Sequence, residues 1–244
     1  MIDFYLVEWL KWRKSRVSLI VYLTMIIYSL FMVLIMVVNK SYLNASLNFT
    51  DLMYQSNILI TTVVGPLFYG SITIYYFYLP IKEKTERTVK LLPISQSKIF
   101  VTKLLFLLSI HFLLGFILII SNILFAFLFS FKGINGQSVL SALYQTNTQV
   151  ILMFMLQMPI VFFVLFFRNK IIPFSAIVVS LLGIITVVDS AFSYIYPYTA
   201  VYAFVEGSKV TYAYLSYRDV PYVVGLYALC FFSWSLYKIT HQDY

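Results

Sequence analysis

Few side chains in this sequence have the types and spacings that catalysis requires. His111 and His241 are the only histidines, and neither has the neighbouring glutamate of a His-Glu-x-x-His zinc site. The sequence has no Gly-x-x-x-x-Gly-Lys-Ser/Thr loop, so the chain cannot bind ATP in that manner. The single cysteine, Cys230, excludes an intrachain disulfide and a multi-cysteine metal site. We therefore expect a chain that is not an enzyme and holds no cofactor or metal of its own.

The composition is that of a membrane protein. Hydrophobic residues make up 61% and charged residues 11% of the chain, whereas soluble domains have roughly 45–50% and about 25%. Nine acidic and 17 basic side chains cannot cover the surface of a soluble protein of 28.4 kDa. The 23 Phe and 21 Tyr residues argue against disorder. We predict an all-α polytopic membrane protein with residues 1–244 in a single transmembrane domain.

Hydropathy predicts six transmembrane helices. The second predicted helix should bend at Gly65 and Pro66. The third would be about 42 Å long, so it must tilt or project beyond a hydrocarbon layer of about 30 Å. The interrupted segment 189–220 is expected to form short helices at the extracellular side. No span contains Asp, Glu, Lys or Arg, which argues against proton coupling. The predicted spans are 17–38, 57–78, 104–131, 149–167, 171–188 and 221–237.

The distribution of positive charge predicts the orientation. With the N-terminus inside, 13 of the 17 Lys and Arg residues face the cytoplasm and 4 face outward. Cytoplasmic loops of membrane proteins are enriched in Lys and Arg. We therefore expect both termini in the cytoplasm, and the net charge of +8 needs no nucleic-acid partner.

Residues 1–16 form a predicted interfacial helix before the first span. Their apolar side chains recur at helical spacing and a basic cluster follows, which is typical of a helix lying in the headgroup plane of the bilayer. A signal peptide is the alternative, but the following apolar run is too long and has no small-residue cleavage site. The side chains expected at the lipid interface are Trp9, Lys11, Trp12, Arg13 and Lys14.

The segment 79–103 is the longest charged stretch and is predicted to be cytoplasmic. Residues 83–90 could form a charged helix, and Ser95 could cap a second helix that enters the third span. The pair Leu91 and Leu92 beside these charges would suit docking of a soluble partner. A solvated connector is the simpler alternative.

This segment resembles the first cytoplasmic loop of ABC-2 type transporter permeases. The N-terminal pattern Glu8-x-x-Lys11-x-Arg13-Lys14-Ser15 is also similar to that family, as are the chain length and the number of spans. The loop residues that carry the resemblance are Glu86, Arg87, Thr88, Leu91, Leu92, Pro93, Ile94, Ser95, Lys98, Ile99 and Lys103.

The resemblance implies a subunit of an ABC exporter in a bacterial cytoplasmic membrane. Two separate ATPase subunits, which hold ATP and Mg²⁺, would act with this chain and a second permease chain, identical or paralogous. Small permeases of this kind often export hydrophobic or amphipathic peptides, in toxin secretion or in immunity to antimicrobial peptides such as lantibiotics, and the resemblance implies such a role here. The implied ATPase-coupling residues are Glu83, Glu86, Arg87, Thr88, Leu91 and Leu92.

Several polar residues within the spans have a possible role in packing or in the transport pathway. His111 is expected to bond a neighbouring helix, with a gating or substrate contact as the alternative. Asn122 and Gln157 are expected to form interhelical hydrogen bonds. Ser175 and Ser180 belong to a row of small residues that favours close helix packing, within the chain or against a partner permease.

Two other classes of function stay open on the sequence alone. The first is a membrane-embedded enzyme acting on lipid or peptide, for which only His111 offers a polar group at membrane depth. The second is a membrane scaffold that binds a partner through 79–103 without transporting anything. Co-purification of an ATPase subunit would distinguish a permease from both.

Overall fold

A computed structural model describes residues 2–43, 47–85, 94–187, 196–206 and 219–240. Every regular element in these ranges is a helix, which confirms the predicted all-α polytopic membrane fold. The elements are α1 Ile2–Lys14, α2 Arg16–Leu43, α3 Phe49–Leu59, the π-helix η1 Ile60–Val64, α4 Gly65–Lys82, α6 Gln96–Leu128, α7 Gly136–Met155, α8 Met158–Phe167, α9 Ile171–Val187, α10 Pro197–Glu206 and α11 Val220–Thr240.

Among the described residues, five helical stretches are long and apolar enough to cross a membrane. The helix α9 has 17 residues and is a shorter apolar helix at the place of the predicted fifth span. The count of six spans therefore stays a prediction. The five stretches are Arg16–Asn39, Phe49–Lys82, Gln96–Leu128, Gly136–Phe167 and Val220–Thr240.

The helices extend well into segments that hydropathy assigns to loops. The polar segment 39–55 is largely helical, because α2 continues to Leu43 and α3 begins at Phe49. Phe49, Leu52 and Met53 lie on one face of α3 and are almost completely buried, at 0%, 0% and 2% exposure. The burial of this face stabilises α3, a helix that the average hydropathy of the segment does not predict.

The segment 132–147 is also mostly helical rather than a loop. The helix α7 begins at Gly136 behind a capping box, in which Ser138 N–H donates to Asn135 Oδ1 and Asn135 N–H donates to Ser138 Oγ. The backbone before this cap pairs with the chain before α3. Phe49 N–H donates to Lys132 O at 2.9 Å, and Lys132 N–H donates to Leu47 O at 2.8 Å.

The expected bend in the second span is a π-helix. The π-helix η1 ends directly before Gly65 and Pro66, and proline is a common cause of such irregularities because it lacks an N–H. A Cβ atom on Gly65 would overlap the Ile60 carbonyl and the Met153 side chain. Glycine at this position thus leaves room for the Ile60 carbonyl of η1.

The predicted fourth span is divided into two helices. Pro159 lies in the first turn of α8, two residues after a turn that separates α8 from α7. Because Pro159 has no N–H, it cannot continue the hydrogen-bond ladder of α7. The third span needs no such break, and α6 runs for 33 residues, about 50 Å by helical rise.

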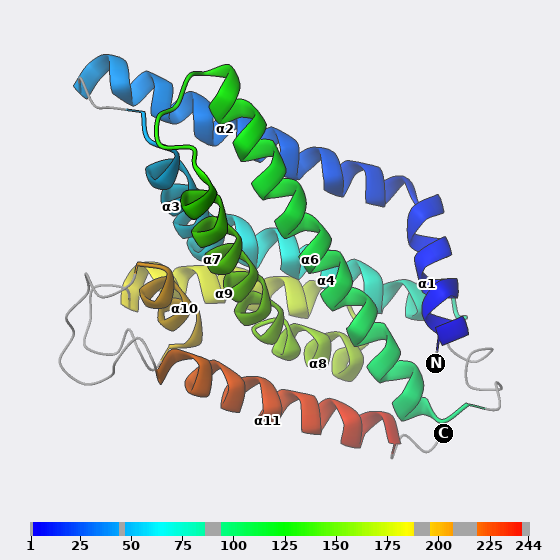
Figure 1. The fold of residues 1–244 in the computed structure, drawn as a ribbon. Coiled ribbons are helices and arrows are strands. Elements are labelled where there is room, and N and C mark those ends of the chain that lie inside the picture. The colour runs from blue at the N-terminus through cyan, green and yellow to red at the C-terminus, as the bar shows by residue number, and fades with distance from the viewer. Residues whose placement is uncertain (1, 44–46, 86–93, 188–195, 207–218, 241–244) are drawn as a thin grey trace.

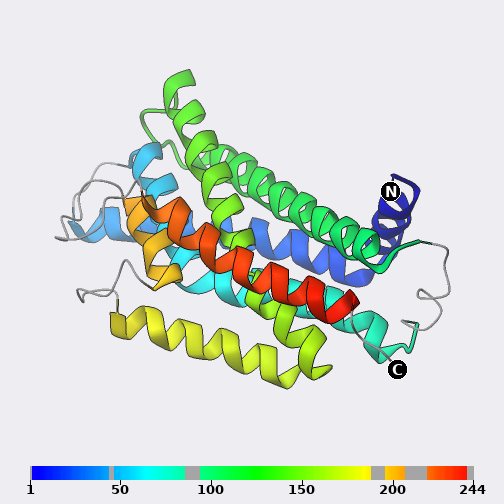
Figure 2. The ribbon, with the colours of Figure 1, turned by 90° about the horizontal axis from the view of Figure 1, so that it is seen from below.

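The helices form a bundle in which most run side by side, while α1 turns sharply away from α2 and lies across one end (Figure 1). The helix α2 packs mainly on α6, and α8 contacts α4, α9 and α11. The helix α9 lies at the edge of the bundle (Figure 2). The short helix α10 packs against α3, η1 and α11 with Ala200 and Val201 fully buried, so it is a part of the bundle.

Candidate functional site

Positive charge gathers at one end of the bundle, here called the basic end. The end of α1 with the start of α2, the end of α4, the start of α6, the α8–α9 turn and the end of α11 all lie there (Figure 1). Of the basic residues in the described ranges, only Lys40 and Lys132 belong to the opposite end. Those of the basic end are Lys11, Arg13, Lys14, Arg16, Lys82, Lys84, Lys98, Lys103, Arg168, Lys170 and Lys238.

The helix α1 is docked on α6 at this end through aromatic side chains. The rings of Tyr5, Trp9 and Trp12 lie 5.7, 6.2 and 6.4 Å from the ring of Phe106. The indole N–H of Trp12 donates to the Tyr22 hydroxyl at 2.8 Å, and Trp12 is only 4% exposed. Trp12 therefore contacts the protein rather than the lipid interface at which the sequence placed it.

The exposed side of α1 does not include Trp9 and Trp12, which we expected at the lipid interface. Leu6, Val7 and Leu10 are exposed, and so are the basic side chains Lys11, Arg13 and Lys14. The aromatic residues recur on the opposite side of the helix, where α6 covers them. The surface of α1 that could contact lipid is thus formed by the three aliphatic residues and the basic ones.

A buried carboxylate lies among these contacts and was not foreseen as a site residue. The Glu8 side chain is 5% exposed, accepts a hydrogen bond from the Tyr76 hydroxyl at 3.0 Å, and lies 3.5 Å from the Lys11 ammonium. The Lys103 ammonium lies 5.2 Å from the centre of the Tyr76 ring. These contacts join α1, α4 and α6. The spacing Tyr5, Glu8, Trp9, which puts Glu8 on the aromatic side of α1, was the available signal.

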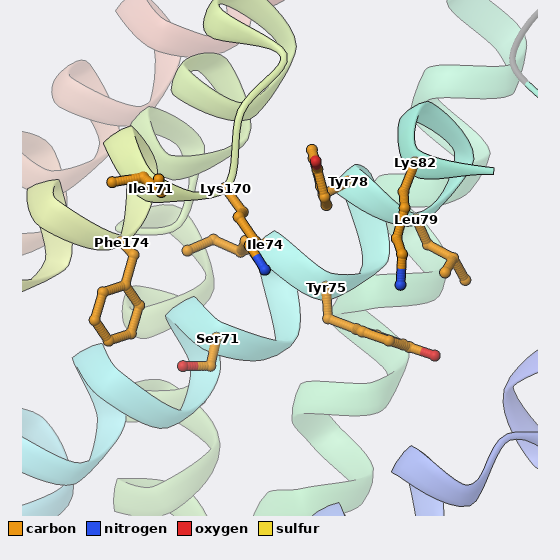
Figure 3. A pocket seen from close by; sticks show the side chains of 9 residues that line it. All are labelled: Ser71, Ile74, Tyr75, Tyr78, Leu79, Lys82, Lys170, Ile171 and Phe174. Carbon is orange, nitrogen blue, oxygen red and sulfur yellow. The ribbon is translucent and has the colours of Figure 1, made fainter. Parts of the chain in front are cut away.

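The described residues line two pockets that open at the basic end. The smaller, the α1–α4 pocket, holds about 180 Å³ and is lined with balanced charge by Glu8, Glu83, Lys11 and Lys103. The larger, the α4–α9 pocket, holds about 460 Å³, and Lys82 enters it from the end of α4 and Lys170 from the turn before α9 (Figure 3). Its lining consists of Ser71, Ile74, Tyr75, Tyr78, Leu79, Lys82, Lys170, Ile171 and Phe174.

The predicted coupling segment is only partly described. The charged helix expected from Glu83 does not begin there, because α4 ends at Lys82 with Glu83 as its C-cap and Lys84 has a positive φ of 54°. Ser95 does occupy the N-cap position of α6, although its side chain makes no capping bond. The remaining residues of the implied coupling site, Glu86, Arg87, Thr88, Leu91 and Leu92, lie outside the described residues.

His111 and Gln157 are completely buried polar residues. The His111 ring stacks on Tyr69 at 4.4 Å, and its Nδ1 lies 2.8 Å from the Leu107 carbonyl of its own helix. The expected hydrogen bond from His111 to a neighbouring helix is thus replaced by a ring contact. Gln157 Nε2 donates to the carbonyl of Met153 one turn earlier, so its bond is local as well.

Other polar residues of the spans make contacts between helices. The hydroxyl of Ser29 donates to Asn122 Oδ1, which confirms the interhelical bond predicted for Asn122. Ser180 is buried, and its carbonyl accepts a bond from the Tyr196 hydroxyl at 2.9 Å. Ser175, by contrast, is exposed on α9, and its hydroxyl donates to the carbonyl of Ile172 in the same helix.

The fold and the basic end define a multi-pass cell-membrane protein without a metal-binding cluster in its described residues. Residues 6–205 match the family described as ABC-2 family transporter protein. The chain therefore belongs to this family of transporter permeases and is not itself an enzyme. Permeases of the family work with ATPase subunits, generally as dimers.

The chain is also similar to a bacterial permease over about two thirds of its length. The chain is 27% identical over 169 residues to the bacitracin transport permease protein BCRB of Bacillus licheniformis. The matched region covers 68% of this chain and 80% of that protein. No solved structure matches the chain significantly.

Proposed function

We propose that this chain is the membrane subunit of an exporter that removes amphipathic peptide antibiotics from a bacterial cytoplasmic membrane. The observation that carries the proposal is the family membership together with the similarity to a bacitracin transport permease. Separate ATPase subunits supply the energy by binding ATP and Mg²⁺, and a second permease chain completes the pathway. The basic end faces the cytoplasm in this proposal, in accord with the positive-inside rule.

The contacts at the basic end support a route for the energy of ATP hydrolysis. In the sequence, residues 86–93 lie between the end of α4 and the start of α6. The Tyr76 hydroxyl on α4 and the Phe106 ring on α6 both contact α1. A force applied to segment 86–93 by an ATPase would therefore act on three helices that are already fixed to one another.

The proposal is tested by weakening the predicted ATPase contact. Leu91→Ala combined with Leu92→Ala, or Glu86→Lys, should leave the protein inserted but lower both ATPase recovery and bacitracin resistance. Removing an interface anchor typically costs about 2 kcal/mol, which is roughly a thirtyfold loss of affinity. The readouts are the amount of ATPase subunit co-purified in detergent and the minimal inhibitory concentration of the peptide in cells.

A matched control removes two leucines elsewhere. Leu19→Ala with Leu23→Ala changes exposed side chains on α2 and should leave both readouts at the wild-type level. Normal ATPase recovery and normal resistance in the variants of residues 86, 91 and 92 would refute the coupling assignment. Purification without any ATPase, together with unchanged resistance on deletion of the gene, would refute the proposed function.

A further inference from the structure

The α4–α9 pocket carries an excess of positive charge. Lys82 and Lys170 are both exposed, and its lining residues include no carboxylate. Within the part of the chain that the structure describes, neither lysine forms an ion pair. The helix α9 begins with Ile171 at this pocket, so the positive end of its dipole adds to the field of the two ammonium groups. The α1–α4 pocket, by contrast, balances its lysines with Glu8 and Glu83.

The remainder of the α4–α9 pocket is apolar and extends along the helices. From Lys82 to Ser71 the pocket follows α4 for eleven residues, about 16 Å by helical rise. Ile74, Tyr75 and Phe174 line this length, and Phe174 is 48% exposed. Lys82 is the last residue of α4 and Lys170 directly precedes α9, so both belong to helix ends, where the headgroups of a bilayer would be. The Lys170 side chain extends from there to the side of Ile74 (Figure 3).

This arrangement matches one kind of molecule. A ligand with a negative headgroup would meet the two lysines, and its hydrocarbon chain would lie on the aromatic and aliphatic lining. We propose that the α4–α9 pocket binds an anionic phospholipid, with its phosphate between Lys82 and Lys170 and an acyl chain along Ile74, Tyr75 and Phe174. This inference does not depend on the transported substrate or on the ATPase partner.

Lipid in this pocket would also touch a residue that is shared with α1. Tyr75 lines both pockets, and its hydroxyl lies 3.4 Å from Ser15 Oγ in the turn between α1 and α2. A lipid in the α4–α9 pocket would therefore contact Tyr75, which itself contacts the turn that leads from α1 into α2.

The experiment measures lipid binding to the purified full-length chain. Native mass spectrometry with palmitoyl-oleoyl phosphatidylglycerol and with the corresponding phosphatidylcholine gives the number of bound lipids and their affinities. We expect tighter binding of phosphatidylglycerol. Lys82→Gln or Lys170→Gln should weaken it about fivefold each, from an interaction of about 1 kcal/mol per lysine with anionic lipid.

Three further variants make the result specific. Lys82→Arg with Lys170→Arg keeps both charges and should retain the preference for phosphatidylglycerol. Lys84→Gln with Lys98→Gln removes two exposed lysines of the same end outside the pocket and should leave the affinity unchanged. Phe174→Ala should weaken the binding of both lipids, because it removes part of the apolar lining of the pocket.

Several outcomes would overturn the proposal. Equal affinity for the two lipids, or equal losses in the Lys82/Lys170 and Lys84/Lys98 glutamine variants, would show that the two lysines do not select the headgroup. Complete displacement of phosphatidylglycerol by inorganic phosphate would assign the pocket to a soluble anion. Lipid bound to the monomer but excluded from the permease dimer would show that a second copy of the chain covers the pocket.

Discussion

Removing the hydroxyl of Tyr76 tests whether α1 is fixed to the bundle by a buried ionic hydrogen bond. Tyr76 is 7% exposed, and its hydroxyl donates to the carboxylate of Glu8, whose side chain is 5% exposed. In Tyr76→Phe the carboxylate stays buried and loses this donor. Lys11 lies 3.5 Å from Glu8, but its side chain is 62% exposed, so it cannot fully compensate.

The expected loss follows from these contacts. A hydrogen bond to a charged group contributes about 1.5–3 kcal/mol, so we expect Tyr76→Phe to lower the free energy of unfolding by about 2 kcal/mol. Tyr75→Phe is the matched control, because the neighbouring Tyr75 hydroxyl is half-buried and lies 3.4 Å from another hydroxyl, that of Ser15, rather than from a carboxylate. Its loss should stay below about 0.5 kcal/mol, since a contact of this length is a weak hydrogen bond.

The assay is an unfolding equilibrium in mixed detergent micelles, with sodium dodecyl sulfate as the denaturant. Glu8→Gln and the double variant complete a cycle that isolates the coupling between the two side chains, expected to be about 1 kcal/mol or more. Equal losses in Tyr76→Phe and Tyr75→Phe, or a coupling near zero, would show that the bond between α1 and α4 does not stabilise the protein.

Three further predictions concern the bundle and its orientation. Gly65→Ala should destabilise the protein by about 1–3 kcal/mol, because the added methyl overlaps the backbone of η1; the same unfolding assay measures it. Asn135→Ala removes the capping box of α7 and should cost about 1 kcal/mol, measured as a lower unfolding midpoint. Single cysteines at Ser46 and Glu86, in a chain whose Cys230 is replaced by Ser, should differ in intact cells. An impermeant reagent should label position 46 and not 86, and the reverse would overturn the predicted orientation.

Hydropathy alone located the apolar stretches, but not all of the helix ends. The predicted bend at Gly65 and Pro66 is present, because proline and glycine act on the local backbone. The start of α3 at Phe49 was missed, since it depends on which face of a partly polar segment is buried. The break before Pro159 was also missed, although that proline supplied a local signal.

The candidate site was harder to predict than the fold. Periodicity correctly predicted that most of residues 1–16 form a helix. Only the contacts with Phe106, however, decide which side of α1 faces the protein. Spacing places Glu8 on the aromatic side of α1, but its burial depends on Tyr76, which lies 68 positions away along the chain. Similarly, Lys82 and Lys170 meet at one pocket only because α4 packs against α9.

Each end of the bundle is stabilised by a different kind of hydrogen bond, and this difference affects how the sequence of each end can evolve. The backbone groups of Leu47, Phe49 and Lys132 link the end opposite the basic one, and most amino acids supply the same backbone groups. The Lys132 side chain can therefore drift while the geometry of that link is inherited unchanged. The basic end depends on the side chains of Glu8 and Tyr76, so a change in one selects for a compensating change in the other. In related permeases, substitutions at the basic end should therefore occur together at contacting positions. Substitutions at the opposite end should occur independently of one another.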